Sequence, residues 1–257
     1  QCIPNPARRG GIFLSRKNRK PSEMRAVTIE RRCQIHPAGS ALIEVGNTCV
    51  ICAATVEDKV PYFLKGTGTG WLTAEYSMLP TSAAVRVPRE LKKPSGRTAE
   101  IQRLIGRTLR NVTDLAALGE RTITIDCDVI QADGGTRTAA ITGALVALVE
   151  ACDSIYEAGK IFPVKDFIAA VSAGISDAGE KILDLNYDED STALADCNVV
   201  MNGSGELVEV QITGEKKSFT RADLSEILDL AELGIKNLID IQKDALGELV
   251  WRVGRID

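Results

Sequence analysis

Hydrophobic and polar residues alternate along much of the first half of the chain, which is the pattern of strands with one buried face. Residues 26–60 predict a meander of three strands, with turns at residues 37–40 and 46–47. The same alternation predicts a short strand at residues 71–78 and another at residues 121–131. The first half of the chain is therefore expected to be rich in β-structure.

Three segments change to the 3.6-residue period of a helix that buries one face. Residues 98–112 carry an apolar stripe opposite a face of arginines, and an alanine-rich stretch predicts a second helix from residue 136 to about residue 156. A capping box at Thr220 and Asp223 opens a third helix, which runs to about Leu246. Between the last two helices, four more strands are expected at residues 167–177, 182–187, 198–201 and 207–213.

The predicted elements follow the order ββββ-α-β-α-ββββ-α. Because strands come in groups instead of alternating with helices, the sequence predicts an α+β fold, a mixed β-sheet with packed helices, and not a doubly wound parallel sheet. Neither an internal repeat of short period nor a linker rich in proline and glycine divides the chain. We therefore expect a single domain over residues 1–257, with residues 1–15 as a candidate disordered extension.

Composition indicates the compartment. Of the 257 residues, 44% are hydrophobic and 26% are charged, which are values of an ordinary globular chain. The uncharged run between Arg137 and Glu150 is too short to span a bilayer, and no apolar run of a signal peptide follows the arginines near the N-terminus. The seven cysteines are scattered and odd in number, which is typical of buried thiols in a reducing compartment. These features predict a cytoplasmic protein without membrane contact.

Charge is unevenly distributed, although the formal net charge is only −4. Residues 8–32 carry nine Lys or Arg and two acids, and residues 86–110 carry eight Lys or Arg and two acids. Residues 182–250 carry fifteen acids and five bases. Two basic segments and one acidic segment suit a protein that binds a polyanion in one place and a metal in another, although solvated helix faces would give the same runs.

Several chemistries lack the residues that they need. His36 is the sole histidine, so metal sites built on several histidines are excluded, and no nucleophile elbow accompanies it for a Ser-His-Asp triad. Cys49 and Cys52 have the spacing of half a zinc site, but they lie on a predicted strand and no second pair exists. The glycine-rich segment at residues 65–71 lacks the spacing of a dinucleotide fingerprint and opens no helix.

The segment DGGTRT at residues 133–138 lies where a predicted strand meets a predicted helix. Its two glycines permit close backbone approach, and the free N–H groups of the following helical turn attract anions. Thr136 could add a hydroxyl donor and Arg137 a charged fork that matches phosphate. An ordinary glycine turn with a threonine cap is the alternative, and the segment is not a P-loop because the Gly-Lys-Ser/Thr spacing is missing.

Five acids fall within residues 184–196. So many carboxylates repel one another unless a cation or solvent lies between them. Brought together by a strand–turn–strand, they would be hard oxygen ligands for Mg²⁺. One of them could instead stay protonated as a general acid, and a solvated acidic turn is the remaining alternative.

Taken together, these segments resemble ribonuclease PH, a family of phosphate-dependent 3′→5′ exoribonucleases. The resemblance runs from about Arg16 to about Leu246. It is carried by strings that follow one another in the family's order: WLTAEYSMLP at 71–80, SGRT at 95–98, EIQRLIGR at 100–107, DCDVIQADGGTRT at 126–138 and LDLNYDED at 183–190.

The resemblance implies a ribosomal-protein-like βαβα unit, and a homo-oligomeric ring of six subunits built as three dimers. It implies that inorganic phosphate, the co-substrate, is bound by Arg97, Gly135, Thr136 and Arg137, with Arg137 also catalytic. The acidic pair that the family associates with catalysis and with a divalent metal, Mg²⁺ or Mn²⁺, falls on Asp190 and Asp196. The arginines predicted to contact RNA are Arg86 and Arg89 after the Met-Leu-Pro string, and Arg19 and Arg25 in the N-terminal motif.

The chain departs from the family pattern at a few positions. In the N-terminal motif, Asn18 and Ala26 replace a glycine and a proline. Ser15 stands where the first arginine of that motif would fall, with Arg16 one position away, and Thr81 replaces an arginine after Met-Leu-Pro. The phosphate and metal residues are kept.

The resemblance implies an enzyme that uses inorganic phosphate to release nucleoside diphosphates from RNA 3′ ends. Its implied substrates are the 3′ ends of tRNA precursors, and its reverse reaction adds nucleotides. Asp190 could hold the metal or protonate the leaving 3′ oxygen. A catalytically inactive, RNA-binding ring subunit of exosome type is the alternative, whereas a small-molecule kinase with a related unit would need a nucleotide loop that the sequence lacks.

Overall fold

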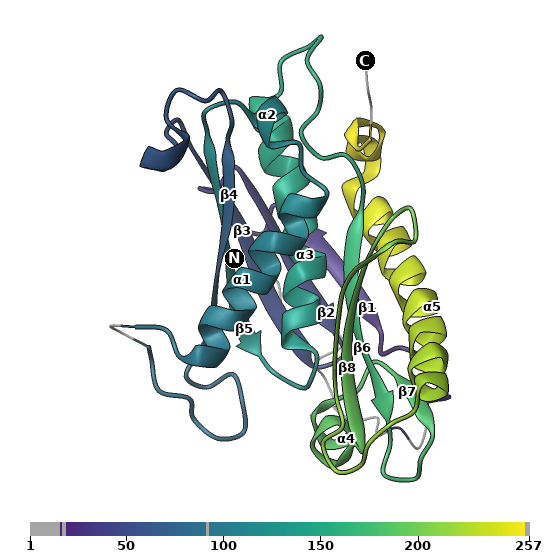
Figure 1. The fold of residues 1–257 in the computed structure, drawn as a ribbon. Helices are drawn as coiled ribbons and strands as arrows, with labels where there is room; N and C mark the ends of the chain where they lie inside the picture. The colour runs from purple at the N-terminus through teal and green to yellow at the C-terminus, as the bar shows by residue number, and fades with distance from the viewer. Residues whose placement is uncertain (1–15, 17–18, 91–92, 255–257) are drawn as a thin grey trace.

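A computed structural model describes residues 16, 19–90 and 93–254 of the chain. It shows two β-sheets with one long helix between them and further helices beside them (Figure 1). The prediction of an α+β fold with packed helices is confirmed. The strands form the predicted mixed sheet and, in addition, a separate antiparallel sheet.

The first sheet contains five strands in the order β1-β2-β3-β5-β4. All neighbours run antiparallel except β4 and β5, which pair in parallel from Trp71↔Thr122 to Met78↔Val129. The carboxyl ends of β4 and β5 therefore lie at the same edge of the sheet. The strands are β1 (Val27–Arg31), β2 (Gly39–Val45), β3 (Thr48–Glu57), β4 (Trp71–Met78) and β5 (Thr122–Gln131).

The second sheet is antiparallel throughout, in the order β7-β6-β8-β9. Its strands are β6 (Ile168–Ile175), β7 (Lys181–Leu183), β8 (Ala195–Asn202) and β9 (Leu207–Thr213). Every residue of β6 is buried, as its continuous apolar run requires. The strand expected at residues 182–187 is shorter than predicted, because Asp184 turns the chain with a positive φ of 53°.

Helix α3 (Thr136–Ile155) lies between the two sheets and packs against β2, β3 and β6. By length and composition alone it could cross a membrane, but 83% of its apolar window is buried inside the fold, as in the core helix of a globular protein. Helix α1 (Gly96–Asn111) packs on β4, and α5 (Arg221–Leu246) packs on β6 and β7 at the right of Figure 1. Side chains of α3 and of both sheets belong to one continuous hydrophobic core.

The shorter helical elements are placed by local side-chain bonds. Helix α4 (Tyr187–Thr192) begins at a capping box in which Asn186 and Glu189 each accept the backbone N–H of the other. The predicted strand–turn–strand for the acids is therefore wrong, since three of them lie in a helical turn. Further short elements within the described residues are α2 (Leu115–Leu118) and the 3₁₀ segments Tyr62–Leu64 and Gly247–Arg252.

Candidate functional site

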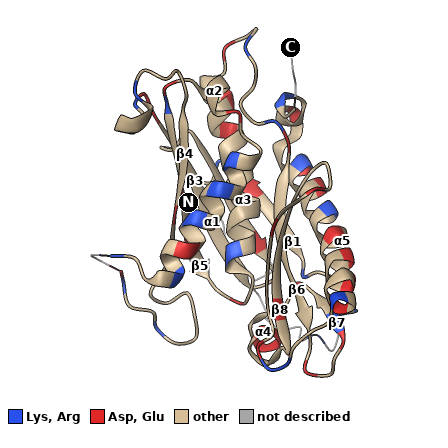
Figure 2. Cartoon of the chain, viewed as in Figure 1, with Lys and Arg blue, Asp and Glu red and all other residues tan. Residues whose placement is uncertain are grey.

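A cleft of about 1410 Å³ opens where β5 passes into α3. Its walls come from α1 and α3 on one side and from α4, β8 and β9 on the other. Six residues that the sequence predicted for the phosphate and metal sites line this one cleft: Arg97, Gly135, Thr136, Arg137, Asp190 and Asp196. Figure 2 shows several basic residues along α1 and acidic residues on α4, and of these Arg97, Asp188 and Asp190 line the cleft.

The loop of residues 133–135, called the glycine loop below, forms the floor between β5 and α3. Gly134 and Gly135 both have a positive φ, of 76° and 67°. A Cβ atom on Gly134 would lie 2.6 Å from the carbonyl oxygen of Leu185, so a side chain there would collide with the segment that leads into α4. The glycines are thus required by conformation and by space. They also leave the first N–H groups of α3 facing the cleft as an anion site.

Thr136, the first residue of α3, is held by a residue to which the sequence analysis gave no role in the site. The hydroxyl groups of Tyr76 and Thr136 lie 2.8 Å apart within hydrogen-bond distance. Tyr76 is on β4 and is only 2% exposed, and its burial raises the pKa of the phenol. A neutral tyrosine therefore fixes the threonine hydroxyl at the cleft floor.

Arg137 is oriented by two side chains from opposite walls. Its Nη1 donates to Oε1 of Gln211 at 3.2 Å and lies 3.6 Å from the carboxylate of Glu100. Gln211 in turn donates to Glu100 at 3.4 Å and to Glu209 at 2.9 Å. This chain of contacts joins α1, α3 and β9 and keeps the guanidinium group at the cleft.

Arg97 lies in the first turn of α1 and lines the same cleft. The turn is fixed by Ser95, whose side chain accepts the N–H of Thr98 at 3.2 Å. Glu90 reinforces the cap, since it accepts the N–H of Ser95 at 3.0 Å. The helix consequently begins at Gly96, two residues before the predicted start, and this brings Arg97 into regular structure.

Asp190 on α4 and Asp196 on β8 are the two acids of the predicted pair. Burial raises the pKa of Asp190, while the nearby charges of Arg97 and Arg137 act in the opposite direction. Burial, followed by the charge of Asp190, raises the pKa of Asp196 to about 6. Two carboxyl groups that do not readily ionise at the same time can bind a cation or transfer a proton.

The other acids of that segment have different roles. Asp184 is buried and paired with Arg25 at 2.6 Å, and Glu189 accepts from Arg19 at 3.0 Å and from Arg16 at 2.5 Å. The crowding of carboxylates noted in the sequence is thus relieved largely by arginines of the N-terminal segment. Arg16, one position from the family's motif arginine, takes part in this network.

The described residues contain no cluster of three or more His, Cys, Asp or Glu that could hold a metal ion by themselves. Asp190 and Asp196 nevertheless fit Mg²⁺, which is commonly bound by one or two carboxylates together with the phosphates of a substrate. The raised pKa values of both groups mark a place where a cation would relieve the cost of ionisation.

The arginines predicted to contact RNA lie outside the cleft lining. Arg86 and Arg89 are exposed on the segment between β4 and α1, of which Ala84 and Val85 line the cleft. Arg19 and Arg25 point inward, with side chains only 6% and 8% exposed. RNA contact by Arg19 and Arg25 stays a prediction that their buried ion pairs do not favour.

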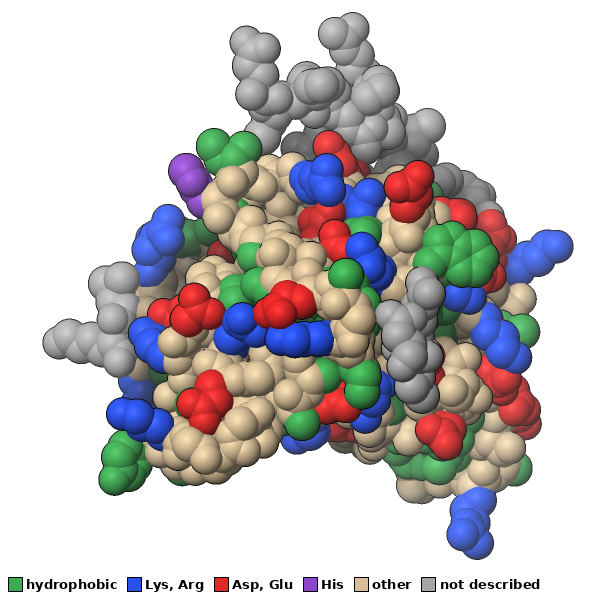
Figure 3. Space-filling model, turned by 90° about the horizontal axis from the view of Figure 1, so that it is seen from above, with side chains coloured by type: hydrophobic (Ala, Val, Ile, Leu, Met, Phe, Trp, Pro, Cys, Tyr) green, Lys and Arg blue, Asp and Glu red, His purple; other side chains and the backbone are tan. Residues whose placement is uncertain are grey.

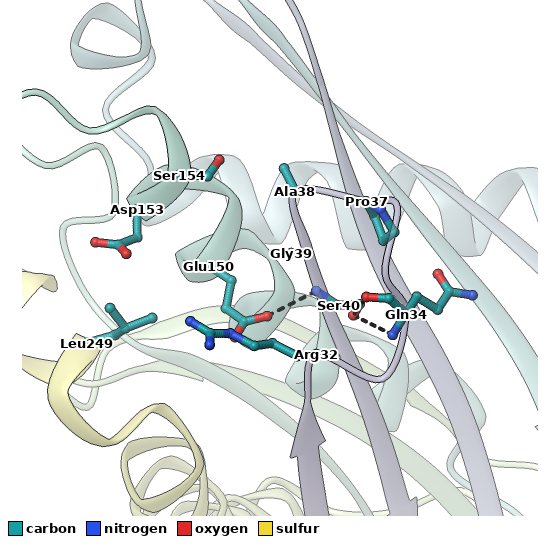
Figure 4. Close-up of a pocket in the computed structure, with 10 residues that line it drawn as sticks. All are labelled: Arg32, Gln34, Pro37, Ala38, Gly39, Ser40, Glu150, Asp153, Ser154 and Leu249. Atoms are coloured by element: carbon teal, nitrogen blue, oxygen red, sulfur yellow. Dashed lines mark hydrogen bonds and ion pairs between the residues drawn. The ribbon is translucent and has the colours of Figure 1, made fainter. Parts of the chain in front are cut away.

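A smaller cavity of about 210 Å³ lies at the C-terminal end of α3, between the β1–β2 connection and the 3₁₀ segment Gly247–Arg252 (Figure 4). Its charged groups are already paired, since Glu150 lies 3.5 Å from Arg32 and Asp153 lies 3.2 Å from Arg252. We assign no ligand to this cavity.

On the face seen from above in Figure 3, basic and acidic side chains of the described residues are interspersed.

Two family models and several known proteins match this chain. The model of the 3′ exoribonuclease family, domain 1, matches residues 23–152, and that of domain 2 matches residues 166–233. Ribonuclease PH of Bacillus cereus (strain AH820) is 58% identical over 239 residues, which cover 91% of this chain and 98% of that protein. Ribonuclease PH of Bacillus thuringiensis subsp. konkukian (strain 97-27) gives the same identity and coverage.

Two solved structures share the fold. Rice Rrp46 superposes with a TM-score of 0.74 at 18% identity, covering 90% of this chain and 100% of that one. A chain of the Archaeoglobus fulgidus exosome with RNA bound to the active site also gives a TM-score of 0.74, at 20% identity, covering 87% of this chain and 91% of that one.

Proposed function

Because the chain belongs to the ribonuclease PH family of phosphorolytic 3′ exoribonucleases, we propose that its cleft is where inorganic phosphate meets the 3′ end of an RNA. The observation that carries this proposal is the convergence of Arg97, Arg137, the glycine loop, Asp190 and Asp196 in one cleft. The four charged residues lie on four different elements, α1, α3, α4 and β8, so only the folded chain assembles them.

Phosphate binds between Arg97 and the N-terminus of α3 in this proposal. Arg137 supplies a charged fork, Thr136 a hydroxyl donor, and the first N–H groups of α3 complete the anion site. Gln211 and Glu100 hold Arg137 in place before phosphate arrives, so little reorganisation accompanies binding.

The reaction then follows from the bound geometry. An oxygen of inorganic phosphate forms a bond to the phosphorus of the terminal phosphodiester, and the bond from that phosphorus to the 3′ oxygen of the preceding nucleotide breaks. The freed 3′ oxygen takes up a proton, and the terminal nucleotide leaves as a nucleoside diphosphate. Negative charge on the phosphoryl oxygens is stabilised by Arg97, Arg137 and the α3 N–H groups.

Asp190 and Asp196 would hold Mg²⁺ or Mn²⁺, which supplies charge neutralisation at the scissile phosphate when bound. The alternative role for Asp190 is donation of the proton to the leaving 3′ oxygen, which its raised pKa supports. Metal titration of Asp190→Asn separates the two roles: loss of metal affinity assigns the ligand, and unchanged affinity with lost turnover assigns the acid.

The substrates we propose are the 3′ ends of tRNA precursors, with nucleotide addition from nucleoside diphosphates as the reverse reaction. The exposed Arg86 and Arg89 would contact the RNA backbone on its way to the cleft. We propose a ring of six copies, built as three dimers, acting in the cytoplasm. The buried free thiols of Cys52, Cys127, Cys152 and Cys197 are consistent with a reducing compartment.

The test uses an end-labelled RNA with a tRNA-like 3′ tail, incubated with Mg²⁺ with and without inorganic phosphate. Nucleoside diphosphates that form only with phosphate support the proposal. RNA that is bound but never shortened would instead favour the catalytically inactive ring subunit, and phosphate-independent release of monophosphates would contradict phosphorolysis. Light scattering tests the ring, for which we expect six times the 27.6 kDa mass of the chain.

A further inference from the structure

The most extensive buried ion pair near the cleft involves two residues that do not line it. Asp184 is 3% exposed and has a positive φ of 53°, a conformation that costs a residue with a side chain about 1 kcal/mol or more. Its carboxylate accepts the backbone N–H of Arg25 at 2.8 Å, Nε at 2.9 Å and Nη2 at 2.6 Å. A carboxylate that is strained and also fully hydrogen-bonded indicates that the fold holds the segment around Asp184 in one fixed position.

The same guanidinium group also reaches the glycine loop. Nη1 of Arg25 donates to the carbonyl oxygen of Asp133, and Nη2 lies 3.4 Å from the carbonyl oxygen of Gly134. Arg25 therefore bonds the glycine loop, which belongs to the first half of the fold, and Asp184, which belongs to the second.

The two segments that Arg25 joins also pack directly against one another. The Cα of Gly134 packs so closely on residues 185–187 that a Cβ would lie 2.6 Å from the oxygen of Leu185. Those residues lead directly into α4, which carries Asp190. The backbone N–H of Leu185 is in turn fixed by the hydroxyl of Ser172 at 3.1 Å.

We propose that Arg25 and Asp184 form a positioning pair that sets the glycine loop against α4, and so fixes the phosphate site relative to the acidic pair. This inference rests on the proposed function for its kinetic readout. Because neither residue lines the cleft, the pair acts through the loop that it holds. A small misplacement of reacting groups costs about tenfold to 100-fold in rate.

The first test compares Arg25→Lys with a matched control, Arg31→Lys. Arg31 lies 3.6 Å from Glu150, another buried carboxylate, but near the C-terminal end of α3 and away from the cleft. Lysine keeps the charge in both variants, yet its single nitrogen cannot take the place of the three guanidinium nitrogens that contact Asp184 and the two loop carbonyls. We expect the KM for phosphate to rise about tenfold in R25K and not in R31K, with the KM for RNA unchanged in both.

Two kinetic results would overturn the proposal. One is a KM for phosphate in R25K equal to that in R31K, which would leave Arg25 with a purely structural role. The other is a rise in the KM for RNA alone, which would make Arg25 an RNA contact. If the unaltered enzyme releases no nucleoside diphosphate, the proposed function is contradicted. The exchange measurement described next then tests the positioning pair separately.

Removal of a buried fork can prevent folding, so a second pair of variants and a second measurement are needed. Asp184→Asn, with Glu150→Gln as its control, makes the same comparison by changing the carboxylate of each ion pair instead of the arginine. Hydrogen exchange on the unaltered protein covers the case in which no variant folds. Added inorganic phosphate should slow exchange in residues 133–138 and in residues 184–187 together, and slowing confined to the first segment would contradict the proposal.

Discussion

The hydroxyl groups of Tyr76 and Thr136 lie 2.8 Å apart, although the residues are on different elements and sixty positions separate them along the chain. Tyr76 is on β4, which pairs in parallel with β5, and β5 leads through the glycine loop to Thr136. The parallel pairing therefore sets the tyrosine beside the start of α3. The proposed phosphate site at the α3 N-terminus thus includes a threonine hydroxyl that a buried side chain of the neighbouring strand holds.

Replacing Tyr76 with phenylalanine tests this dependence. The variant keeps the buried ring and removes only the bond to Thr136, so we expect a loss of about 1 kcal/mol in the free energy of unfolding. We also expect kcat/KM for phosphate to fall about fivefold, because the threonine hydroxyl is no longer fixed. Tyr62→Phe is the control, since Tyr62 is 93% exposed. Equal kinetics in the two variants would remove Tyr76 from the account.

Arg137→Ala should abolish phosphorolysis without unfolding the protein. Loss of one charged group that stabilises a transition state lowers kcat by about 100-fold or more. Arg137 is only partly buried, so its removal leaves the hydrophobic core intact. Arg103→Ala, on the exposed face of α1, should keep full activity. Normal activity of the Arg137 variant would show that the phosphate site is elsewhere.

Asp196→Asn should change the pH dependence of stability. The pKa of Asp196 is raised in the fold to about 6, above its usual value of 3.8, so the folded state binds the proton more tightly than the unfolded state. This group therefore lowers the free energy of unfolding as pH rises from about 4 through 6. At pH 8 the asparagine variant should be more stable than the parent by roughly 2 kcal/mol, and the gain should vanish near pH 4. Denaturant unfolding at the two pH values measures it, and a gain independent of pH would contradict the assignment.

The chain should unfold as one domain, as the sequence predicts. Helix α3 packs against strands of both sheets, and one hydrophobic core joins them. Urea unfolding followed by circular dichroism and by the fluorescence of Trp71, in a Trp251→Phe variant, should give coincident midpoints. Separate transitions would show that the two sheets fold independently.

Local patterns were sufficient for much of the fold. The alternation at residues 71–78 and 121–131 located β4 and β5, and the apolar run from residue 136 located α3, because one buried face or a buried helix leaves a direct signature in the sequence. Helix α4 was missed because it is too short for a period to show. Its start depends on a capping box between Asn186 and Glu189, which lies within the run of acidic residues and is masked by it in the sequence.

The functional site could be predicted only in part, because sequence patterns show local features and not contacts between distant residues. The DGGTRT string and the acids mark chemistry locally, whereas the contacts that arrange them are distant in sequence. Arg25 and Asp184 are 159 positions apart, and Arg137 and Gln211 are 74 positions apart. The strand patterns that contain Tyr76 and Gln211 do not reveal which distant side chains these residues contact, so only the folded chain shows what orients Arg137 and Thr136.

The most direct test of phosphorolysis in this cleft follows the attacking oxygen. The protein is incubated with unlabelled RNA, Mg²⁺ and radiolabelled inorganic phosphate, and the released nucleotides are separated. We expect nucleoside diphosphates that carry the label in the β-phosphate, and none with Arg137→Ala. Unlabelled monophosphates released from the RNA would show that water is the nucleophile and would contradict a phosphorolytic site in this cleft.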